Sequence, residues 1–163
     1  MGYPLTDCLP IDYAETTGST FTLNPLLQQV ADLELPAGEY AIFGSGPLLV
    51  RGVIDAVSDI DILCRGAAWR CAQELGAAVY LAEQDVDIIS IDDGVITIGK
   101  TWGYGDFDTD ILINSAELID GLPFVRLEYV VAYKRIANRR KDHEHLQVLQ
   151  AKGFWPETGQ AAR

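Results

Sequence analysis

Two aspartates, Asp59 and Asp61, stand in a segment that alternates polar and apolar residues from Ser58 to Ile62. Such alternation predicts a strand, in which residues two apart share a face and their Cα atoms lie about 6–7 Å apart. Carboxylates at that spacing repel each other, and in a partly buried site each raises the pKa of the other. A hard divalent cation such as Mg²⁺ prefers oxygen ligands and would offset this repulsion. The pair therefore predicts a metal site; the alternative is that both carboxylates point into water.

A glycine-containing turn precedes these aspartates. The apolar run 40–43 predicts a strand that stops at Gly44-Ser45-Gly46, and Pro47 predicts the start of a helix. Without a Cβ at Gly44, a phosphate can approach the main chain, and the free N–H groups of a helix start attract it. The turn can lie beside Asp59 only if the two strands run antiparallel, so we expect a mixed sheet. Taken alone, Gly-Ser-Gly usually marks an ordinary turn.

A second aspartate-rich segment could supply a further carboxylate. Two metal ions about 3.5–4 Å apart need such a group to bridge them. Residues 107–113 alternate in the same way and predict a strand, with Asp106, Asp108 and Asp110 on one face. Periodicity does not choose among the three. Asp110 is the first candidate because it enters the most apolar part of the segment, and Asp108 is the second.

The charge of the chain is unevenly distributed. The 163 residues carry 24 acidic and 12 basic side chains, a formal net charge of −12. This excess of negative charge argues against binding to long duplex nucleic acid, which needs many cations against the phosphates. Five basic residues nevertheless lie between Lys134 and Lys141. This cluster is either a solvated helix face or a place that receives an anion. His143 and His145, which follow it, are expected at the surface.

The remaining patterns define the fold class. Asn24-Pro25 predicts the N-cap and first residue of a helix, and Asp92-Asp93-Gly94 predicts a hairpin turn. From Pro123 onward the apolar period becomes helical. We therefore expect an α/β (α+β) fold: a mixed β-sheet with helices packed on it. Residues 1–122 would form this core with an N-terminal extension, and residues 123–163 a helical segment packed on it within one structural domain.

Targeting and membrane segments are not expected. No apolar run approaches the roughly 20 residues that span a bilayer. The residues from Met1 to Pro4 show no basic, then apolar, leader pattern. These patterns predict a cytoplasmic protein without a membrane partner.

Gly44-Ser45, the double aspartate Asp59-x-Asp61 and a later aspartate resemble the nucleotidyltransferase fold of the DNA polymerase beta superfamily. Lys134, Arg139 and the pair Lys141-Asp142 resemble the basic C-terminal run of its small bacterial members. Those members include the type found in toxin–antitoxin and abortive-infection systems. The resemblance covers about residues 40–150.

The resemblance implies an enzyme that transfers a nucleoside monophosphate from a nucleoside triphosphate to a hydroxyl acceptor and releases pyrophosphate. Asp59 and Asp61 would hold two Mg²⁺ ions. Asp110, or Asp108, would ligate one metal and act as general base toward the acceptor hydroxyl.

The resemblance also implies a set of nucleotide-binding residues. Gly44 and Ser45 would hold the β- and γ-phosphates, and Lys134 would neutralise charge on the leaving pyrophosphate. Arg139, Arg140 and Lys141 would border the nucleotide or an acidic acceptor. The acceptor itself stays open: a small molecule, a tRNA end or a protein.

Two other interpretations remain. One is a non-catalytic member of the same fold that binds a partner protein, for example as one component of a toxin–antitoxin pair. The other is a plain α/β interaction domain in which these motifs have no chemical role. The enzyme interpretation requires nucleotide binding that tightens with Mg²⁺ and is lost in Asp59→Asn or Asp61→Asn.

Overall fold

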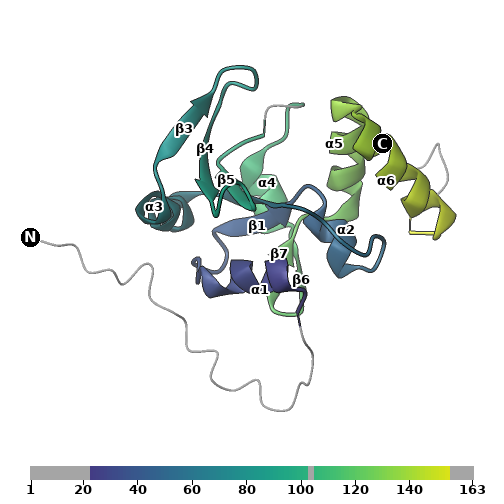
Figure 1. Ribbon diagram of the computed structural model, residues 1–163, viewed down its shortest axis with the longest axis horizontal. Coiled ribbons are helices and arrows are strands. Elements are labelled where there is room, and N and C mark those ends of the chain that lie inside the picture. The colour runs from purple at the N-terminus through teal and green to yellow at the C-terminus, as the bar shows by residue number, and fades with distance from the viewer. Residues whose placement is uncertain (1–22, 103–104, 155–163) are drawn as a thin grey trace, which may run out of the picture.

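The computed structural model describes residues 23–102 and 105–154, which fold into one mixed sheet with helices on both of its faces (Figure 1). The strands are β1 (Tyr40–Phe43), β2 (Ile60–Cys64), β3 (Ala78–Leu81), β4 (Val86–Ile91), β5 (Ile96–Gly99), β6 (Glu117–Ile119) and β7 (Leu122–Phe124). The helices are α1 (Pro25–Asp32), α2 (Gly46–Val50), α3 (Gly66–Leu75), α4 (Thr109–Asn114), α5 (Leu127–Ala137) and α6 (Arg140–Ala151).

The sheet has the strand order β3-β4-β5-β2-β1-β7-β6. Its two central strands, β1 and β2, are antiparallel, whereas β1 pairs with β7 and β2 pairs with β5 in parallel. The mixed sheet and the antiparallel pairing of its first two strands, both predicted from the sequence, are confirmed. This pairing brings the end of β1 to the start of β2.

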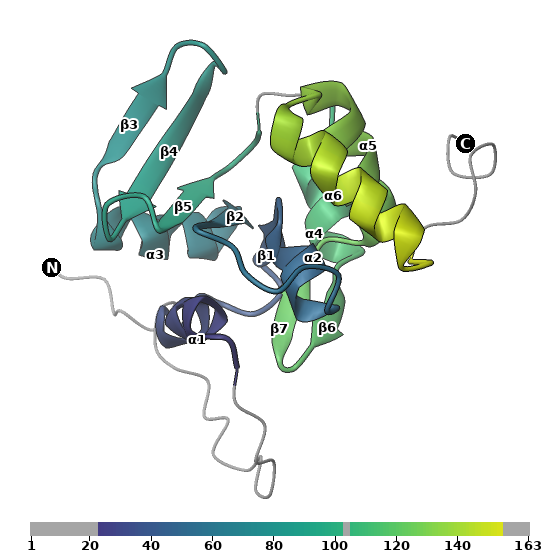
Figure 2. The ribbon, with the colours of Figure 1, turned by 45° about the vertical axis from the view of Figure 1, so that its right-hand side comes forward.

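Alternate residues of the central strands pack into two separate cores. Ile42, Ile60 and Ile62 face a core that includes α1 and α3. Phe43 and Leu63 face a second core with α4, α5 and α6. The two groups of helices are seen on opposite sides of the sheet in Figures 1 and 2. Asp61 lies between Ile60 and Ile62 along β2, so the pleat assigns it to the face of the second core.

Two of the local predictions are confirmed. The side chain of Asn24 caps α1, because its Oδ1 accepts a hydrogen bond from the Leu26 N–H at 2.9 Å. Strands β4 and β5 form an antiparallel hairpin, with Asp92 and Asp93 at φ +56° and +54° in the turn. Asparagine and aspartate tolerate this left-handed conformation better than most residues.

The strand predicted over residues 107–113 is wrong. This segment contains α4, which begins at Thr109, and Asp108 is its N-cap: Oδ1 accepts from the N–H groups of Asp110 and Ile111 at 2.9 and 3.3 Å. The helix buries Leu112 and leaves Ile111 51% exposed. Polar and apolar residues thus alternate in the sequence of this segment, but its backbone is helical because the capping aspartate starts a helix.

The C-terminal part begins with a strand pair. Strands β6 and β7 form a hairpin at the sheet edge, and α5 and α6 follow it. The boundary expected between residues 122 and 123 falls inside β7, which belongs to the sheet. The expected N-terminal extension, residues 1–22, lies outside the described residues. Within the described ranges, the helices are too short and too polar to cross a membrane.

Candidate nucleotide-binding site

The end of β1 and the start of β2 form one wall of the candidate site. Phe43 pairs with Asp61 in the antiparallel register, and Gly44 follows directly. A Cβ built on Gly44 would lie 2.6 Å from Asp61 Oδ2, and the residue has φ +67°. The hydrogen atom of Gly44 thus leaves room for the Asp61 carboxylate. This space was predicted to admit a phosphate, but the Asp61 carboxylate occupies it.

Asp61 is an electrostatically strained carboxylate. Burial, followed by repulsion from Asp59, raises its pKa from 3.8 to about 6, and the positive charges of Lys141, Arg139 and Lys134 oppose that rise. Asp59 lies just before β2, is half-buried, and accepts a hydrogen bond from Ser58 Oγ at 3.3 Å. Among the described residues, no hydrogen bond or ion pair reaches the Asp61 carboxylate. A cation placed against both aspartates would relieve their repulsion.

Ser45 presents its hydroxyl to the interior of the site. It stands at the N-cap of α2 but makes no capping hydrogen bond with its side chain. Its Oγ instead lies 3.4 Å from Lys134 Nζ and 3.5 Å from His145 Nδ1. The next residue, Gly46, has no space for a side chain, since a Cβ there would lie 2.4 Å from Ile42 Cγ2. Residues 45, 134 and 145 thus meet from three separate segments of the chain.

Lys134 is a buried cation. Its side chain, in the last turn of α5, is 1% exposed and forms an ion pair with Asp142 Oδ1 at 3.3 Å. Burial lowers the pKa of Lys134, and Asp142 opposes that change. The ammonium group also lies 3.0 Å from His145 Nδ1. Burying a lysine is costly unless partners satisfy its N–H groups, and these partners do so.

Asp142 joins the two C-terminal helices. Residue Asn138, at φ +54°, turns the chain so that α6 lies beside α5 (Figures 1 and 2). The fully buried Asp142 carboxylate accepts from the backbone N–H of Arg139 at 3.1 Å and from its Nε at 2.7 Å. Burial alone would raise the pKa of Asp142, but the hydrogen bonds from Arg139 and the charge of Lys134 lower it. The carboxylate therefore stays ionised between two cations.

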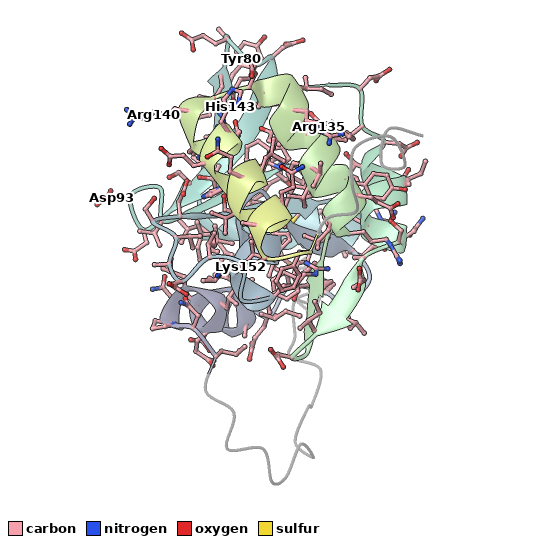
Figure 3. All side chains as sticks on the ribbon, turned by 90° about the vertical axis from the view of Figure 1, so that its right-hand side faces the viewer. Tyr80, Asp93, Arg135, Arg140, His143 and Lys152 are labelled. Carbon is pink, nitrogen blue, oxygen red and sulfur yellow. The ribbon has the colours of Figure 1, made fainter. Side chains whose placement is uncertain are left out.

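The basic cluster of the sequence divides into two kinds of residue. Lys134 and Arg139 are held by Asp142, and together with Lys141 they act on Asp61 through their charge. Arg140 is 94% exposed and pairs with Glu144 one turn away. Figure 3 shows Arg140 and His143 on the outer side of α6. Of the two histidines expected at the surface, His143 is exposed, whereas His145 is partly buried and belongs to the site.

The structure does not bring Asp108 or Asp110 to this group. Asp110 pairs with Arg65 at 2.8 Å, and Arg65 directly follows β2. Four residues of extended chain, or about 13 Å, separate Arg65 from Asp61. Asp108 caps α4, whose first residue, Thr109, donates to the Lys100 carbonyl just past the end of β5. Both aspartates therefore lie toward the other end of β2, and Asp106 is exposed in the same segment.

A hydroxyl lies where a further carboxylate could adjoin Asp61. Thr97 on β5 pairs with Asp61 in the parallel register, and its neighbours Ile96 and Ile98 face the opposite core. Within the described part of the chain, no group of three or more histidine, cysteine, aspartate or glutamate side chains is placed to hold a metal ion. Sequence reasoning missed Thr97, gave Asp142 no role beyond its place in the Lys141-Asp142 pair, and expected His145 at the surface; only the last two carried a local signal, their position beside the basic run.

The donor set can be compared with the needs of Mg²⁺. This ion commonly uses one or two carboxylates and takes its other ligands from water and substrate phosphates. Asp59 and Asp61 supply that number, and the raised pKa of Asp61 shows that a nearby positive charge would be favourable. The two carboxylates therefore fit the needs of one Mg²⁺ ion. A second ion would need a carboxylate that the described residues do not supply here.

Comparisons with known proteins agree with this architecture. No protein-family model matches the sequence, and no curated protein matches it. Among solved structures, the fold is similar to a crystal structure described as a "putative nucleotidyltransferase" from Thermotoga maritima. The TM-score is 0.51 and the identity 17%, over 82% of this chain and 98% of that one. At this identity the likeness shows the fold, which is the nucleotidyltransferase-like mixed sheet.

Proposed function

We propose that the protein is a nucleotidyltransferase that binds a nucleoside triphosphate with Mg²⁺ and transfers its nucleoside monophosphate group to a hydroxyl acceptor. One observation carries the proposal: Lys134 Nζ lies 3.4 Å from Ser45 Oγ, at the end of the sheet where Gly44 contacts Asp61. A cation and a hydroxyl that suit phosphate thus adjoin carboxylates that suit a metal. An unrelated interaction domain has no physical reason to combine these groups.

Each group has a proposed part in binding. Asp59 and Asp61 hold the metal ion, which polarises the phosphoryl group under attack. Ser45 and Lys134 bind the β- and γ-phosphates, and Lys134 offsets the charge that develops on the leaving pyrophosphate. Arg139 and Lys141 lie along the nucleotide and attract it through their positive charges. Asp108 and Asp110 have no part in this arrangement, so the acceptor hydroxyl is deprotonated by solvent or by a group of the acceptor.

The binding step is tested by titrating ATP and GTP into the protein with Mg²⁺ and with EDTA in a calorimeter. Binding should tighten at least about tenfold with Mg²⁺ and lose that gain in Asp59→Asn and Asp61→Asn. Asp93→Asn is the matched control: it removes one carboxylate from an exposed turn, and asparagine tolerates its φ of +54°. Equal affinity with and without Mg²⁺ would rule out the proposal.

The transfer step needs its own test, because a second candidate function shares the binding step. Among the described residues only two carboxylates, Asp59 and Asp61, are available for a metal ion, which favours a non-catalytic protein that binds nucleotide and a partner, such as a toxin–antitoxin component. Incubation of the protein with α-³²P-labelled nucleotides and RNA, protein and small-molecule fractions distinguishes the two. Label on one fraction, absent with Asp61→Asn, supports transfer. Nucleotide binding without label in any fraction supports the non-catalytic function.

A further inference from the structure

His145 lies closest to the ammonium group of Lys134. Its Nδ1 is 3.0 Å from Lys134 Nζ, nearer than Asp142 Oδ1 at 3.3 Å or Ser45 Oγ at 3.4 Å. The same Nδ1 lies 3.5 Å from Ser45 Oγ. His145 comes from α6, Lys134 from α5 and Ser45 from the turn before α2. One ring nitrogen therefore joins the two groups to which we assign the phosphates.

The chemistry of these neighbours fixes the protonation of the ring. An ammonium group has three N–H donors and no acceptor. Lys134 must therefore donate to Nδ1, which carries no proton, and the single ring proton of a neutral histidine lies on Nε2. Burial, followed by the charge of Lys134, lowers the pKa of His145, which favours this neutral form.

A neutral acceptor has a consequence for the charge of the cluster. Lys134 and Arg139 are positive and share the one negative charge of Asp142. With His145 neutral, the four side chains keep a net charge of +1. A carboxylate at position 145 could accept the same hydrogen bond, but it would reduce the net charge to zero. An anion such as a triphosphate is attracted more strongly by the first arrangement.

We propose that His145 is a positioning residue for the triphosphate: it directs the Lys134 ammonium group toward Ser45 while leaving the cluster positively charged. The inference rests on the proposed function. According to this inference, His145 makes the site bind a nucleotide with β- and γ-phosphates more tightly than one without them. A residue that only fills space would affect folding, and would affect both nucleotides equally.

The test compares the affinities of Mg²⁺-ATP and AMP in the full chain. His145→Asp should weaken ATP binding at least about tenfold and leave AMP within about twofold, because only the terminal phosphates meet Lys134. His145→Asn keeps a neutral acceptor near the position of Nδ1 and should retain most of the discrimination. His143→Asp, on the exposed side of the same helix, adds the same charge and should change neither affinity more than about twofold.

Two outcomes overturn the inference and leave the proposed function intact. One is a ratio of ATP affinity to AMP affinity that is the same in His145→Asp as in the unmodified protein. The other is an NMR spectrum of the ¹⁵N-histidine-labelled unmodified chain that places the His145 proton on Nδ1, a measurement that needs no variant to fold. If the unmodified protein binds ATP no better than AMP, the proposed function and the inference both fail. An Nε2–H proton together with selective loss of ATP in His145→Asp supports the inference.

Discussion

Gly44 and Asp61 fit together so closely that the glycine has no space for a side chain. A Cβ on Gly44 would lie 2.6 Å from Asp61 Oδ2, and the backbone there has φ +67°. The contact follows from the antiparallel register, in which Phe43 is the partner of Asp61. The carboxylate thus packs against the turn that leads to Ser45. The residues proposed to contact the metal and the phosphates therefore adjoin the same turn.

The first prediction concerns that contact. Gly44→Ala should lower the free energy of unfolding by about 1–2 kcal/mol for the left-handed backbone and by a further 1–3 kcal/mol for crowding of Asp61. Gly52→Ala is the control, since Gly52 has φ +73° but no atom within 4 Å of its Cβ position. Urea denaturation of both variants measures the difference. Equal losses would show that the Gly44 position tolerates a methyl group.

The second prediction concerns the pH dependence of stability in EDTA. The folded pKa of Asp61, about 6, exceeds its ordinary value of 3.8, so the native state binds more protons than the unfolded state between these values. Asp61 therefore costs stability progressively as the pH rises through this window. Asp61→Asn should match the unmodified protein near pH 4 and exceed it by up to about 3 kcal/mol at pH 7.5. Urea denaturation at both pH values measures this, and a pH-independent difference would contradict it.

The third prediction concerns the buried ion pair of Lys134 and Asp142. Asp142→Asn leaves the Lys134 charge buried without a carboxylate and should cost about 3 kcal/mol. Glu144→Gln removes a carboxylate two residues away, from an exposed i,i+4 pair with Arg140, and should cost about 0.5 kcal/mol or less. Chemical denaturation at pH 7 compares the two variants. Similar small losses would mean that water reaches Lys134 in solution.

The fourth prediction separates structure from chemistry at Asp108. Asp108→Ala removes the N-cap of α4 and should cost about 1 kcal/mol, whereas Asp108→Ser retains a capping oxygen and should cost less. Both variants should bind Mg²⁺-nucleotide as the unmodified protein does, because Asp108 lies away from Asp61. Calorimetric titration checks this, and a selective loss of binding at normal stability would place Asp108 in the site.

Local patterns were sufficient where neighbouring residues determine the structure. The alternation that ends at Ile62 marked β2, and Asn24-Pro25 marked the start of α1. The positions of Gly44 and Asp59 were informative for a different reason: only an antiparallel pair of strands brings the two residues together, and that requirement predicted the topology of β1 and β2.

The failure at residues 107–113 has a physical cause. The polar and apolar residues alternate there as they do in β2, so periodicity favoured a strand. An aspartate before an apolar run also suits a helix N-cap, and the packing of Leu112 and Ile113 under the sheet selects the helix. The sequence contains both possibilities, and tertiary contacts decide between them.

The contacts of His145 could not be predicted because they depend on how three segments fold together. His145 and Ser45 are 100 residues apart, and helical periodicity does not say where α6 lies against α5. That placement depends on the left-handed Asn138 and on the buried Asp142. The basic run left open a solvated helix face or a place that receives an anion, and the contacts of Lys134 were visible only in the folded chain.

Arg65 anchors the end of β2 that lies away from Asp61. Its guanidinium group donates to the Gly38 carbonyl at 3.0 Å, to Asp110 at 2.8 Å and to Asn114 at 2.6 Å. These contacts join α4 to the sheet without drawing on the residues around Asp61. Substitutions around Asp61 are therefore expected to leave the register of β1 and β2 intact, because the opposite end of these strands is held by separate contacts.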